Sequence, residues 1–186
     1  MSLPHAILAL LENEDASGYD LARHFAQCGG HVWSATHQQI YLELGKLHQS
    51  GWVEYETVSQ DNKPDKKVYS ITESGVKELI RWLQRPAAPK RVREAMLIKV
   101  LGSHLVPGEL VQDELRRQRE ENEEILLRFR EMEAEFSSPA SLTGSRRSAY
   151  IALRRGILDR EAWLTWADEA QRMLQEETPS PVFEQG

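Results

Sequence analysis

The sequence predicts a mainly α-helical protein that carries one two-stranded hairpin in its first half and a long helix in its second half. Apolar residues recur at helical spacing through residues 3–49, and two runs rich in β-forming residues follow. A break with two prolines, "QRPAAPKR" at 84–91, separates them from a purely helical remainder. We therefore expect an N-terminal winged unit over 1–85, a linker over 86–91, a helical dimerisation domain over 92–176 and a disordered tail over 177–186.

The first two helices are predicted by short apolar patterns and by the residues at their ends. Residues 3–13, "LPHAILALLEN", place four aliphatic side chains within five positions and predict a short, mostly buried helix. Ser17 stands where it can cap a second helix, and Gly29-Gly30 is expected to end that helix. The inward face of the second helix is predicted to consist of Leu21, Ala22 and Phe25.

The third helix is unusual because hydrogen-bonding side chains fill its first turn. Residues 36–39, "THQQ", stand where a buried helix would carry apolar side chains. Thr36 and Gln39 have the spacing of a capping box, although Ser34 could cap the helix instead. The face that packs on the first two helices is predicted from apolar residues at i, i+4 and i+7, namely Ile40, Leu44 and Leu47.

A hairpin and a fourth helix complete the N-terminal unit. Gly51 is expected to end the third helix, and a strand rich in β-formers follows it. A turn-rich loop over 59–67 separates this strand from a second one over 68–73, and Thr72 or Ser74 then begins the fourth helix. The inward face of that helix is predicted to contain Val76, Leu79, Ile80 and Leu83. Three helices, a hairpin and a closing helix in this order predict a winged helix-turn-helix, with the 59–67 loop as the wing.

The second half is predicted to contain helices over 92–105, about 107–136 and 144–176. The long middle helix carries a heptad seam, which the polar residues Gln118 and Asn122 interrupt. A helix of about 30 residues rises about 45 Å, so we expect the same helix of a second chain as its partner. The alternative is a hairpin with the 144–176 helix of the same chain. The residues expected at the dimer interface are Leu115, Asn122, Ile125, Phe129 and Met132.

Composition excludes several classes of protein. The formal net charge is −6, and the first 85 residues hold eight Lys/Arg against eleven Asp/Glu, which argues against a broad basic surface. No apolar run approaches the ~18 residues that span a bilayer, and the N-terminus lacks the features of a secretory signal. The single cysteine, Cys28, excludes an internal disulfide and fits a reducing compartment. We therefore expect a cytoplasmic protein without a membrane span.

Four blocks of the sequence resemble the PadR family of transcriptional regulators. The blocks are "SGYDL" at 17–21, "WSATHQQIYLELGKL" at 33–47, "GWVEYE" at 51–56 and "KKVYSITESGVKEL" at 66–79. The longer blocks are similar to the family's pattern of Trp-Ser, Ile-Tyr-x-x-Leu-x-x-Leu and Lys-x-Tyr-x-Leu-Thr-x-x-Gly. "REAMLIKVLGSHL" and the helical remainder resemble the longer branch of the family, which includes a repressor that responds to phenolic acids. Leu42 stands where many members have proline, and Gly45 lies inside the helix, so the operator sequence cannot be carried over.

The resemblance implies a homodimeric winged-helix regulator, usually a repressor. Its C-terminal helices would dimerise, and its two recognition helices would enter successive major grooves of a palindromic operator in double-stranded DNA. In the phenolic-acid-responsive subgroup, aromatic acids such as p-coumarate and ferulate release the repressor from DNA. The expected effector is therefore a small aromatic acid.

The polar first turn of the third helix is the candidate base-reading surface. Gln can bond adenine with two hydrogen bonds, and the N-terminal end of a recognition helix reaches the base edges. We expect His37, with Gln38 or Gln39, to read bases, and cationic or hydroxyl groups to contact phosphates. The alternatives are an ordinary polar first turn and a solvated charged hairpin tip. The full candidate set is Ser34, Thr36, His37, Gln38, Gln39, Tyr41, Lys46, Lys63, Lys66, Lys67 and Tyr69.

Aromatic side chains combined with a cation are the candidates for an effector site. Aromatic planes and a guanidinium would suit a planar aryl carboxylate. The alternative is that these aromatic side chains fill the dimer core. The candidate residues are Tyr19, Tyr150, Arg154 and Trp163, with Trp166 close by in the sequence.

Two rival functions follow from other features of the sequence. Cys28 and His31 have a ligand-like spacing, but no downstream pair matches it, so we expect no metal site and keep a metal-sensing repressor as a rival. The second rival is a protein-interaction adaptor that kept the winged fold and lost operator binding. No nucleophile elbow, phosphate loop or zincin motif occurs, so we expect no catalytic residue, no cofactor and no enzymatic activity.

Overall fold

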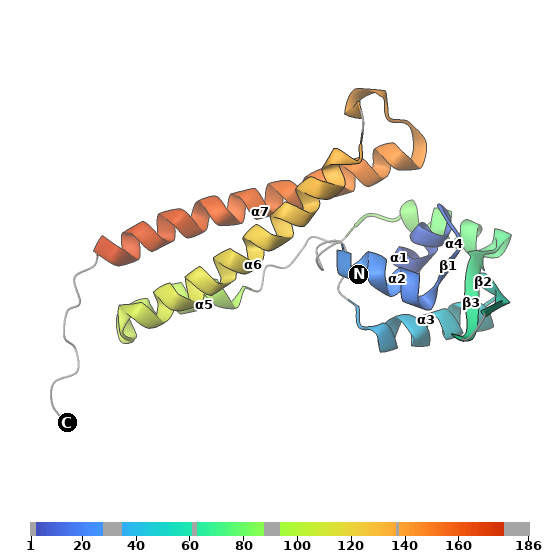
Figure 1. Cartoon of the computed structure of the whole chain (residues 1–186), viewed down its shortest axis with the longest axis horizontal. Coiled ribbons are helices and arrows are strands. Elements are labelled where there is room, and N and C mark those ends of the chain that lie inside the picture. Colours follow the sequence, from blue (N-terminus) through green and yellow to red (C-terminus); the bar gives the residue numbers. More distant parts are fainter. Residues whose placement is uncertain (1–2, 28–34, 61–62, 88–93, 137, 177–186) are drawn as a thin grey trace. The chain divides into compact units, whose positions relative to one another are not determined.

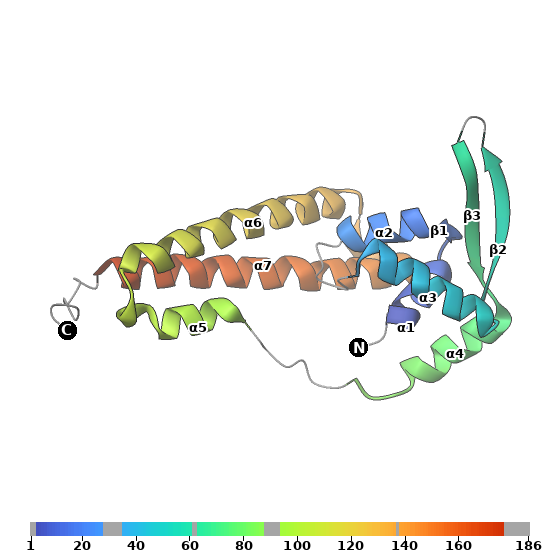
Figure 2. The same ribbon diagram turned by 90° about the horizontal axis from the view of Figure 1, so that it is seen from below.

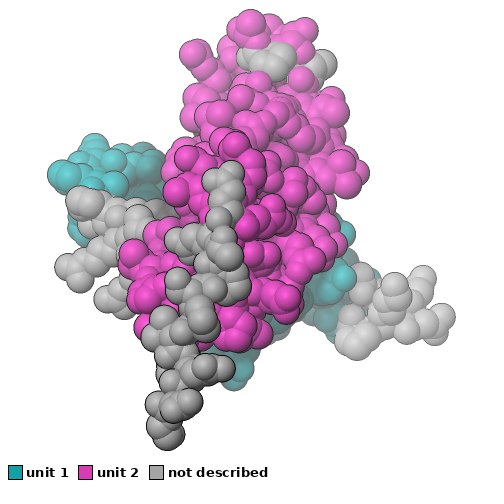
Figure 3. All heavy atoms as spheres, turned by 90° about the vertical axis from the view of Figure 1, so that its left-hand side faces the viewer, with its two compact units in different colours: residues 1–88 teal, residues 89–186 magenta. Residues whose placement is uncertain are grey.

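The chain is divided into two compact units, each with its own hydrophobic core. The computed structural model describes residues 3–27, 35–60, 63–87, 94–136 and 138–176. The units comprise residues 1–88 and 89–186, which Figure 3 colours separately. The mainly helical fold predicted from the sequence is confirmed. Ser34, Cys28, His31, most of the predicted linker and the predicted tail over 177–186 lie outside the described residues.

Among the described residues of the first unit, three of four helices begin at a hydroxyl cap, as predicted. The Oγ of Ser17 accepts a hydrogen bond from the backbone N–H of Asp20 at 3.2 Å. Thr36 and Thr72 cap their helices in the same way, through side chains that accept from the N–H three residues later. Each cap satisfies a donor that the helix itself leaves unpaired. The helices are α1 (Leu3–Leu11), α2 (Gly18–Gln27), α3 (His37–Gln49) and α4 (Glu73–Leu83) (Figure 1).

The sheet of the first unit has three antiparallel strands in the order β1-β3-β2. These are β1 (Ala16–Ser17), β2 (Val53–Gln60) and β3 (Lys63–Ile71). The short strand β1 was not predicted. The predicted loop over 59–67 is wrong for most of its length, because Val58 pairs with Lys66 and Gln60 pairs with Lys63. Cross-strand hydrogen bonding therefore continues almost to the tip, and Figure 2 shows this β2–β3 hairpin, the wing, projecting beyond the helices of its own unit.

The core of the first unit lies where α1, α2 and α3 meet the sheet. Leu21, Ala22 and Phe25 are buried, as are Ile40, Leu44 and Leu47, so the predicted inward faces of α2 and α3 are confirmed. The predicted inward face of α4 is only partly correct. Leu79 is buried and Val76 is half-buried, whereas Ile80 and Leu83 are exposed. Helix α4 instead covers the core with a narrow stripe formed by Gly75, Glu78 and Leu79.

The turn between α3 and β2 is fixed to the start of α4. Gly51 ends α3 with a φ of +70°, a conformation that glycine adopts without strain. The hydroxyl of Thr72 donates to the carbonyl oxygen of Gly51 at 2.6 Å. Gly75 lies so close to the chain that a Cβ there would stand 2.1 Å from the carbonyl oxygen of Trp52. The base of the wing and the end of α3 are therefore held by the same helix start.

The second unit is a helical hairpin with a short helix packed against it. Its elements are α5 (Ala95–Leu101), the 3-10 turn η1 (Ser103–Leu105), α6 (Gly108–Ala134), the 3-10 turn η2 (Pro139–Ser141) and α7 (Gly144–Glu176). Helices α6 and α7 lie side by side (Figures 1 and 2), and Met96 of α5 is buried in the core that they share. The predicted single helix over 92–105 is interrupted at Gly102. Within the described ranges, no helix is both long and apolar enough to cross a bilayer.

The heptad seam of α6 packs inside the chain. Leu115, Asn122 and Phe129 are 1%, 7% and 3% exposed in the single chain. A guanidinium N–H of Arg160 on α7 donates to Oδ1 of Asn122. A side chain that is already buried has almost no surface left to offer a second chain. In the single chain these three residues therefore pack within the intrachain hairpin that was the alternative, and Ile125 and Met132 on the same seam are half-buried. Their contact with a second chain stays a prediction.

Candidate nucleic-acid interface

The first turn of α3 presents exposed polar side chains that differ in their freedom to contact a ligand. The side-chain oxygen of Gln39 accepts a hydrogen bond from the backbone N–H of Thr36 at 2.9 Å. The Thr36 hydroxyl in turn accepts from the backbone N–H of Gln39 at 3.2 Å. This reciprocal pair is a capping box, so it uses the group through which Gln39 would accept from a base. His37 and Gln38 are exposed on the same turn and remain the stronger base-reading candidates.

Aromatic side chains bring the start of α2 next to the start of α3. Tyr19 is 60% exposed, and its ring centroid lies 6.2 Å from that of His37. The ring of Tyr41 covers Gly18, where a Cβ would meet its Cε1 atom at 2.5 Å. Tyr19, which the sequence suggested for an effector site, therefore lies beside the candidate base-reading turn. Tyr41 is exposed, as a phosphate contact requires.

Three of the four lysines proposed for phosphate contact are engaged within the chain. Nζ of Lys46 lies 3.0 Å from Oε2 of Glu43, on the outer face of α3. Nζ of Lys67 lies 4.1 Å above the ring centroid of Tyr55, a cation–π geometry. Nζ of Lys66 lies 2.8 Å from Oδ2 of Asp20. Lys63 begins β3, and its side chain lies outside what the structure describes.

Asp20 is a residue of this surface that the sequence analysis missed. The hydrogen bond from Lys66, followed by that from Ser17, lowers the pKa of Asp20 from 3.8 to about 2. The carboxylate is therefore ionised at neutral pH. Asp20 follows Ser17 by three positions, a capping spacing visible in the sequence, but its pairing with Lys66 depends on the fold.

Tyr69 belongs to the core more than to the surface. Its side chain is only 8% exposed, and its ring centroid lies 5.4 Å from that of Tyr55. Burial raises the pKa of the Tyr69 hydroxyl. The proposed phosphate contact through this hydroxyl has little accessible surface to support it. The role of Tyr69 is therefore explained by packing, since its ring lies against that of Tyr55 and close to Tyr41 of α3.

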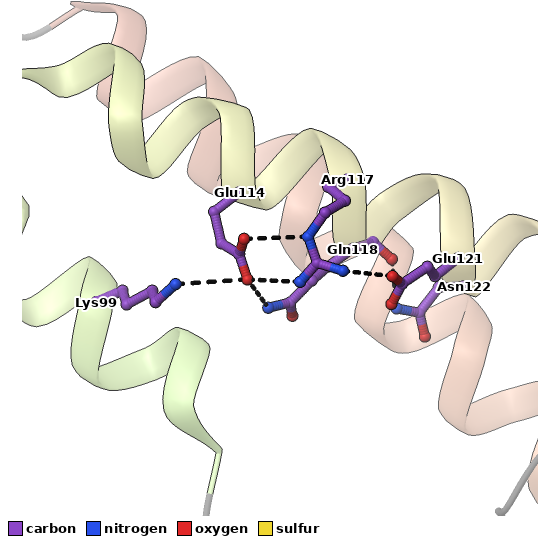
Figure 4. A network of polar contacts seen from close by, with 6 residues as sticks. All are labelled: Lys99, Glu114, Arg117, Gln118, Glu121 and Asn122. Atoms are coloured by element: carbon purple, nitrogen blue, oxygen red, sulfur yellow. Dashed lines mark hydrogen bonds and ion pairs between the residues drawn. The ribbon is translucent and has the colours of Figure 1, made fainter.

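A network of polar contacts in the second unit has a structural explanation. Glu114 of α6 accepts from Arg117 at 2.7 Å and from Gln118 at 2.7 Å, and Lys99 of α5 lies 3.5 Å away (Figure 4). These partners, Arg117 first, lower the pKa of Glu114 to about 2. Glu121 pairs with the other side of the Arg117 guanidinium. The network joins α5 to α6.

Within the second unit, the effector candidates lie at two separate places. Arg154 donates to Oε1 of Glu133 at 2.8 Å, and the hydroxyl of Tyr150 lies 3.5 Å from the same atom. Nε1 of Trp163 instead donates to Oε1 of Glu94 at 2.7 Å. Tyr150 and Trp163 are thirteen positions apart on one helix, which corresponds to about 20 Å. Tyr19 belongs to the other unit.

No metal site is formed by the part of the chain that the structure describes. No group of three or more His, Cys, Asp or Glu side chains in the described ranges could hold an ion. Cys28 and His31, whose spacing suggested a metal site, lie outside those ranges.

Comparison with known proteins identifies the family of both units. Residues 7–81 match the Transcriptional regulator PadR-like family, and residues 92–175 match the family described as Virulence activator alpha C-term. A probable transcriptional regulator of Mycobacterium tuberculosis is 37% identical, over 95% of this chain and 99% of that protein. The negative transcriptional regulator PadR of Bacillus subtilis is 29% identical, over 92% of this chain and 97% of that protein.

Solved structures of relatives share the fold over almost the whole chain. The Vibrio cholerae virulence activator AphA is 35% identical, with a TM-score of 0.73 over 94% of this chain and 98% of that one. Bacillus subtilis PadR in complex with operator DNA is 28% identical, with a TM-score of 0.77 over 92% and 98% of the two chains. The match spans both units, including the winged unit with the exposed turn of α3. The chain belongs to the PadR-like family of DNA-binding transcriptional regulators, and it is not an enzyme.

Proposed function

We propose that this regulator reads its operator in the major groove with His37 and Gln38, the exposed residues of the first turn of α3. One observation carries the proposal: the Thr36–Gln39 capping box holds this turn in place and leaves those two side chains exposed. A fixed backbone lowers the entropy lost when the side chains engage base edges. Gln38 can bond adenine through two hydrogen bonds, and His37 can donate to or accept from a base. The phosphate contacts we propose are Thr36, Tyr41, Lys46, Lys66 and Lys67.

Binding to the chain's own upstream DNA, followed by fluorescence anisotropy, tests this proposal. Gln38→Ala and His37→Ala should each weaken specific binding by about 1–3 kcal/mol and leave binding to random DNA unchanged. Gln49→Ala, at the far end of the same helix, is the matched control and should change neither. An adaptor that has lost operator binding would show no preference for any sequence, and that result would overturn the proposal.

We also propose that two chains associate through an apolar face formed by α5, η1 and the first turn of α6. These elements follow one another in the chain and expose six large apolar side chains. Soluble monomers rarely expose so many apolar groups together, and a two-fold symmetric operator requires two recognition helices. A second copy is therefore the partner that best suits this face. The six residues are Leu97, Ile98, Leu101, Leu105, Val106 and Leu110.

Sedimentation measurements test the dimer proposal. A double variant, Ile98→Glu with Leu101→Glu, should sediment as a monomer at concentrations where the unaltered chain is a dimer. Its operator affinity should fall because one chain then binds one half-site. Leu127→Glu is the matched control, since Leu127 is also an exposed apolar residue but lies on α6 outside this face. A double variant that remains dimeric would contradict the proposed interface.

We further propose that the regulator is a repressor that a small aromatic acid releases from DNA. One relative is named a negative regulator and another a virulence activator, so a reporter fused to the chain's own promoter must decide the direction. Support for the effector comes from a solved structure of Bacillus subtilis PadR in complex with p-coumaric acid. Arg154, with Tyr150 beside it, is the cation we propose for the acid in this chain.

The effector proposal is tested by adding a panel of phenolic acids to the DNA complex. Glu133 already pairs with Arg154, so an incoming carboxylate must displace it. Glu133→Gln should therefore lower the concentration of acid that releases DNA, and Arg154→Met should abolish the response. Arg155→Met, which alters the neighbouring guanidinium paired with Asp159, is the matched control. An unchanged response in Arg154→Met would place the acid elsewhere.

A further inference from the structure

The wing residue Lys66 is held by a carboxylate of helix α2. Its Nζ lies 2.8 Å from Oδ2 of Asp20, and an Nη atom of Arg23 lies 3.6 Å from Oδ1. The hydroxyl of Ser17 donates to Oδ2 at 2.6 Å, and the Ser17 backbone N–H donates to the same atom at 3.3 Å. Two cationic side chains and two donors of Ser17 therefore face one carboxylate, entirely within the first unit.

The position of Asp20 is fixed by the backbone around it. Its own N–H donates to the Oγ of Ser17, which closes the first turn of α2. Ser17 also belongs to β1 and pairs with Val68 of β3, two positions from Lys66. The Asp20 carboxylate cannot turn away from Lys66 without losing the two hydrogen bonds that it accepts from Ser17.

A lysine that already faces a carboxylate gains less from approaching DNA. Moving the Lys66 ammonium onto a phosphate would break the ion pair and leave the Asp20 charge close to the DNA. The pair carries no net charge, so it releases no condensed counterion when it meets the duplex. An unpaired lysine at the same place would release one. The difference should matter here, because the first 85 residues hold only eight Lys/Arg.

We propose that Asp20 limits the attraction between the wing and DNA by holding Lys66, and that it thereby sets the salt dependence of DNA binding. The inference rests on the proposed function in one respect, namely that Lys66 faces a phosphate. Asp20 acts through Lys66 and contacts no base. It therefore lowers affinity for the operator and for unrelated DNA by the same factor, and leaves sequence preference to the first turn of α3.

The test measures how the affinity of the full chain changes with salt. The probe is a random-sequence duplex, titrated at salt concentrations from about 50 to about 200 mM. Asp20→Asn keeps a side-chain oxygen for the cap and removes the charge. It should bind roughly 2–5-fold more tightly at low salt, and its salt slope should steepen by about 0.9 per bound chain. Weaker binding would mean that Asp20 aims Lys66 at DNA, which would overturn the proposal.

A matched control separates this local effect from a change in net charge. Glu73→Gln removes the same charge from an exposed pair with Lys77 on α4, and it should leave the salt slope unchanged. Introducing Asp20→Asn into a Lys66→Met chain should have a much smaller effect, because only Arg23, 3.6 Å from Asp20, then loses its carboxylate. A steepening as large as in the chain that keeps Lys66 would, in either case, contradict the proposal.

Lys66→Met alone distinguishes the possible failures. If it leaves DNA binding unchanged, the proposed wing contact and this inference both fall, while base reading by Gln38 is untouched. If it weakens binding but Asp20→Asn does not strengthen it, only this inference falls. Should Asp20→Asn not fold, lysine ammonium NMR on the unaltered chain decides. In the free chain the Lys66 ammonium should exchange slowly with solvent because Asp20 holds it. Exchange as fast as that of Lys77, whose pair with Glu73 is open to solvent, would overturn the proposal.

Discussion

The side-chain oxygen of Gln39 accepts the backbone N–H of Thr36 at 2.9 Å, so two adjacent glutamines of α3 have different roles. Gln39 closes the capping box that begins the helix, whereas Gln38 is exposed on the same turn. The sequence "THQQ" does not distinguish the two residues by type. Their positions relative to Thr36 do, because only the residue three positions after the cap can return a hydrogen bond to it.

Gln39→Ala should lower the free energy of unfolding by about 1 kcal/mol, since it removes one half of the capping box. Gln38→Ala should change it by less than about 0.5 kcal/mol, as expected for an exposed side chain. Urea denaturation of the two variants side by side provides the measurement. Equal losses of stability would show that the capping box does not distinguish these residues.

Gly75→Ala and Gly45→Ala should change stability in opposite directions. A Cβ at Gly75 would stand 2.1 Å from the carbonyl oxygen of Trp52 and 2.8 Å from Cγ1 of Ile71, so the backbone must move. We expect a loss of about 3 kcal/mol. A Cβ at Gly45, inside α3, would meet nothing within 4 Å, and alanine there should add about 0.5–1 kcal/mol through its helix propensity. Thermal denaturation of both variants provides the measurement. Stability changes of the same sign in the two variants would contradict this prediction.

Features of the fold that depend on neighbouring residues were predictable from the sequence. The caps at Ser17, Thr36 and Thr72 are local, because each hydroxyl bonds an N–H three residues later. The length of the wing was not predictable. Lys63 and Lys66 have low β-propensity, and only pairing with β2 places them in a strand. Strand β1 was not predicted because it has only two residues, which are too few to show the alternating pattern of a strand.

For features that depend on distant residues, the sequence predicted that a face is packed but not which element packs against it. The heptad spacing through Leu115, Asn122 and Phe129 identifies a packed face, but spacing alone cannot say which helix packs against it. The burial of these residues in one chain shows that the partner is α7. The candidate DNA surface was located by the position of the first turn of α3. The pairing of Lys66 with Asp20 joins residues 46 positions apart, and no local pattern indicates it.

The contribution of Asp20 to stability should disappear in acid. Its pKa is about 2 in the folded chain and 3.8 as the ordinary value, so the folded state favours the ionised form. The stabilisation is therefore fully present above pH 3.8 and is lost as the pH falls through about 2. Because 28% of the side chain is solvent-exposed, screening should reduce it to roughly 1 kcal/mol. The stability difference between the unaltered chain and Asp20→Asn, followed by urea denaturation from pH 7 downward, should shrink below pH 4.

The control for this pH dependence is Asp15→Asn, which alters an exposed carboxylate in the turn before α2. It should change stability by less than about 0.5 kcal/mol. A constant difference between the unaltered chain and Asp20→Asn across the range would show that the Asp20 charge contributes nothing to folding.

The buried pair between Asn122 and Arg160 should determine how α6 and α7 align. A guanidinium N–H of Arg160 donates to Oδ1 of Asn122, and Nδ2 of Asn122 donates to the carbonyl oxygen of Gln118 at 2.7 Å. The Arg160 side chain is half-buried, and burial lowers the pKa of its guanidinium. Asn122→Ala removes one acceptor from this half-buried cation, and should therefore lower the free energy of unfolding by about 1–3 kcal/mol.

Asn122→Asp provides the discriminating comparison for this pair. Aspartate keeps an oxygen for Arg160 and adds a charge-assisted hydrogen bond, although it cannot donate to Gln118. If Arg160 is the partner that matters, Asn122→Asp should retain more stability than Asn122→Ala in urea denaturation. Glu124→Ala, an exposed change two positions away on α6, should alter stability by less than about 0.5 kcal/mol. Equal losses in the Asp and Ala variants would mean that the bond to Gln118, within α6 itself, supplies the stability, and that Arg160 does not fix the alignment of the two helices.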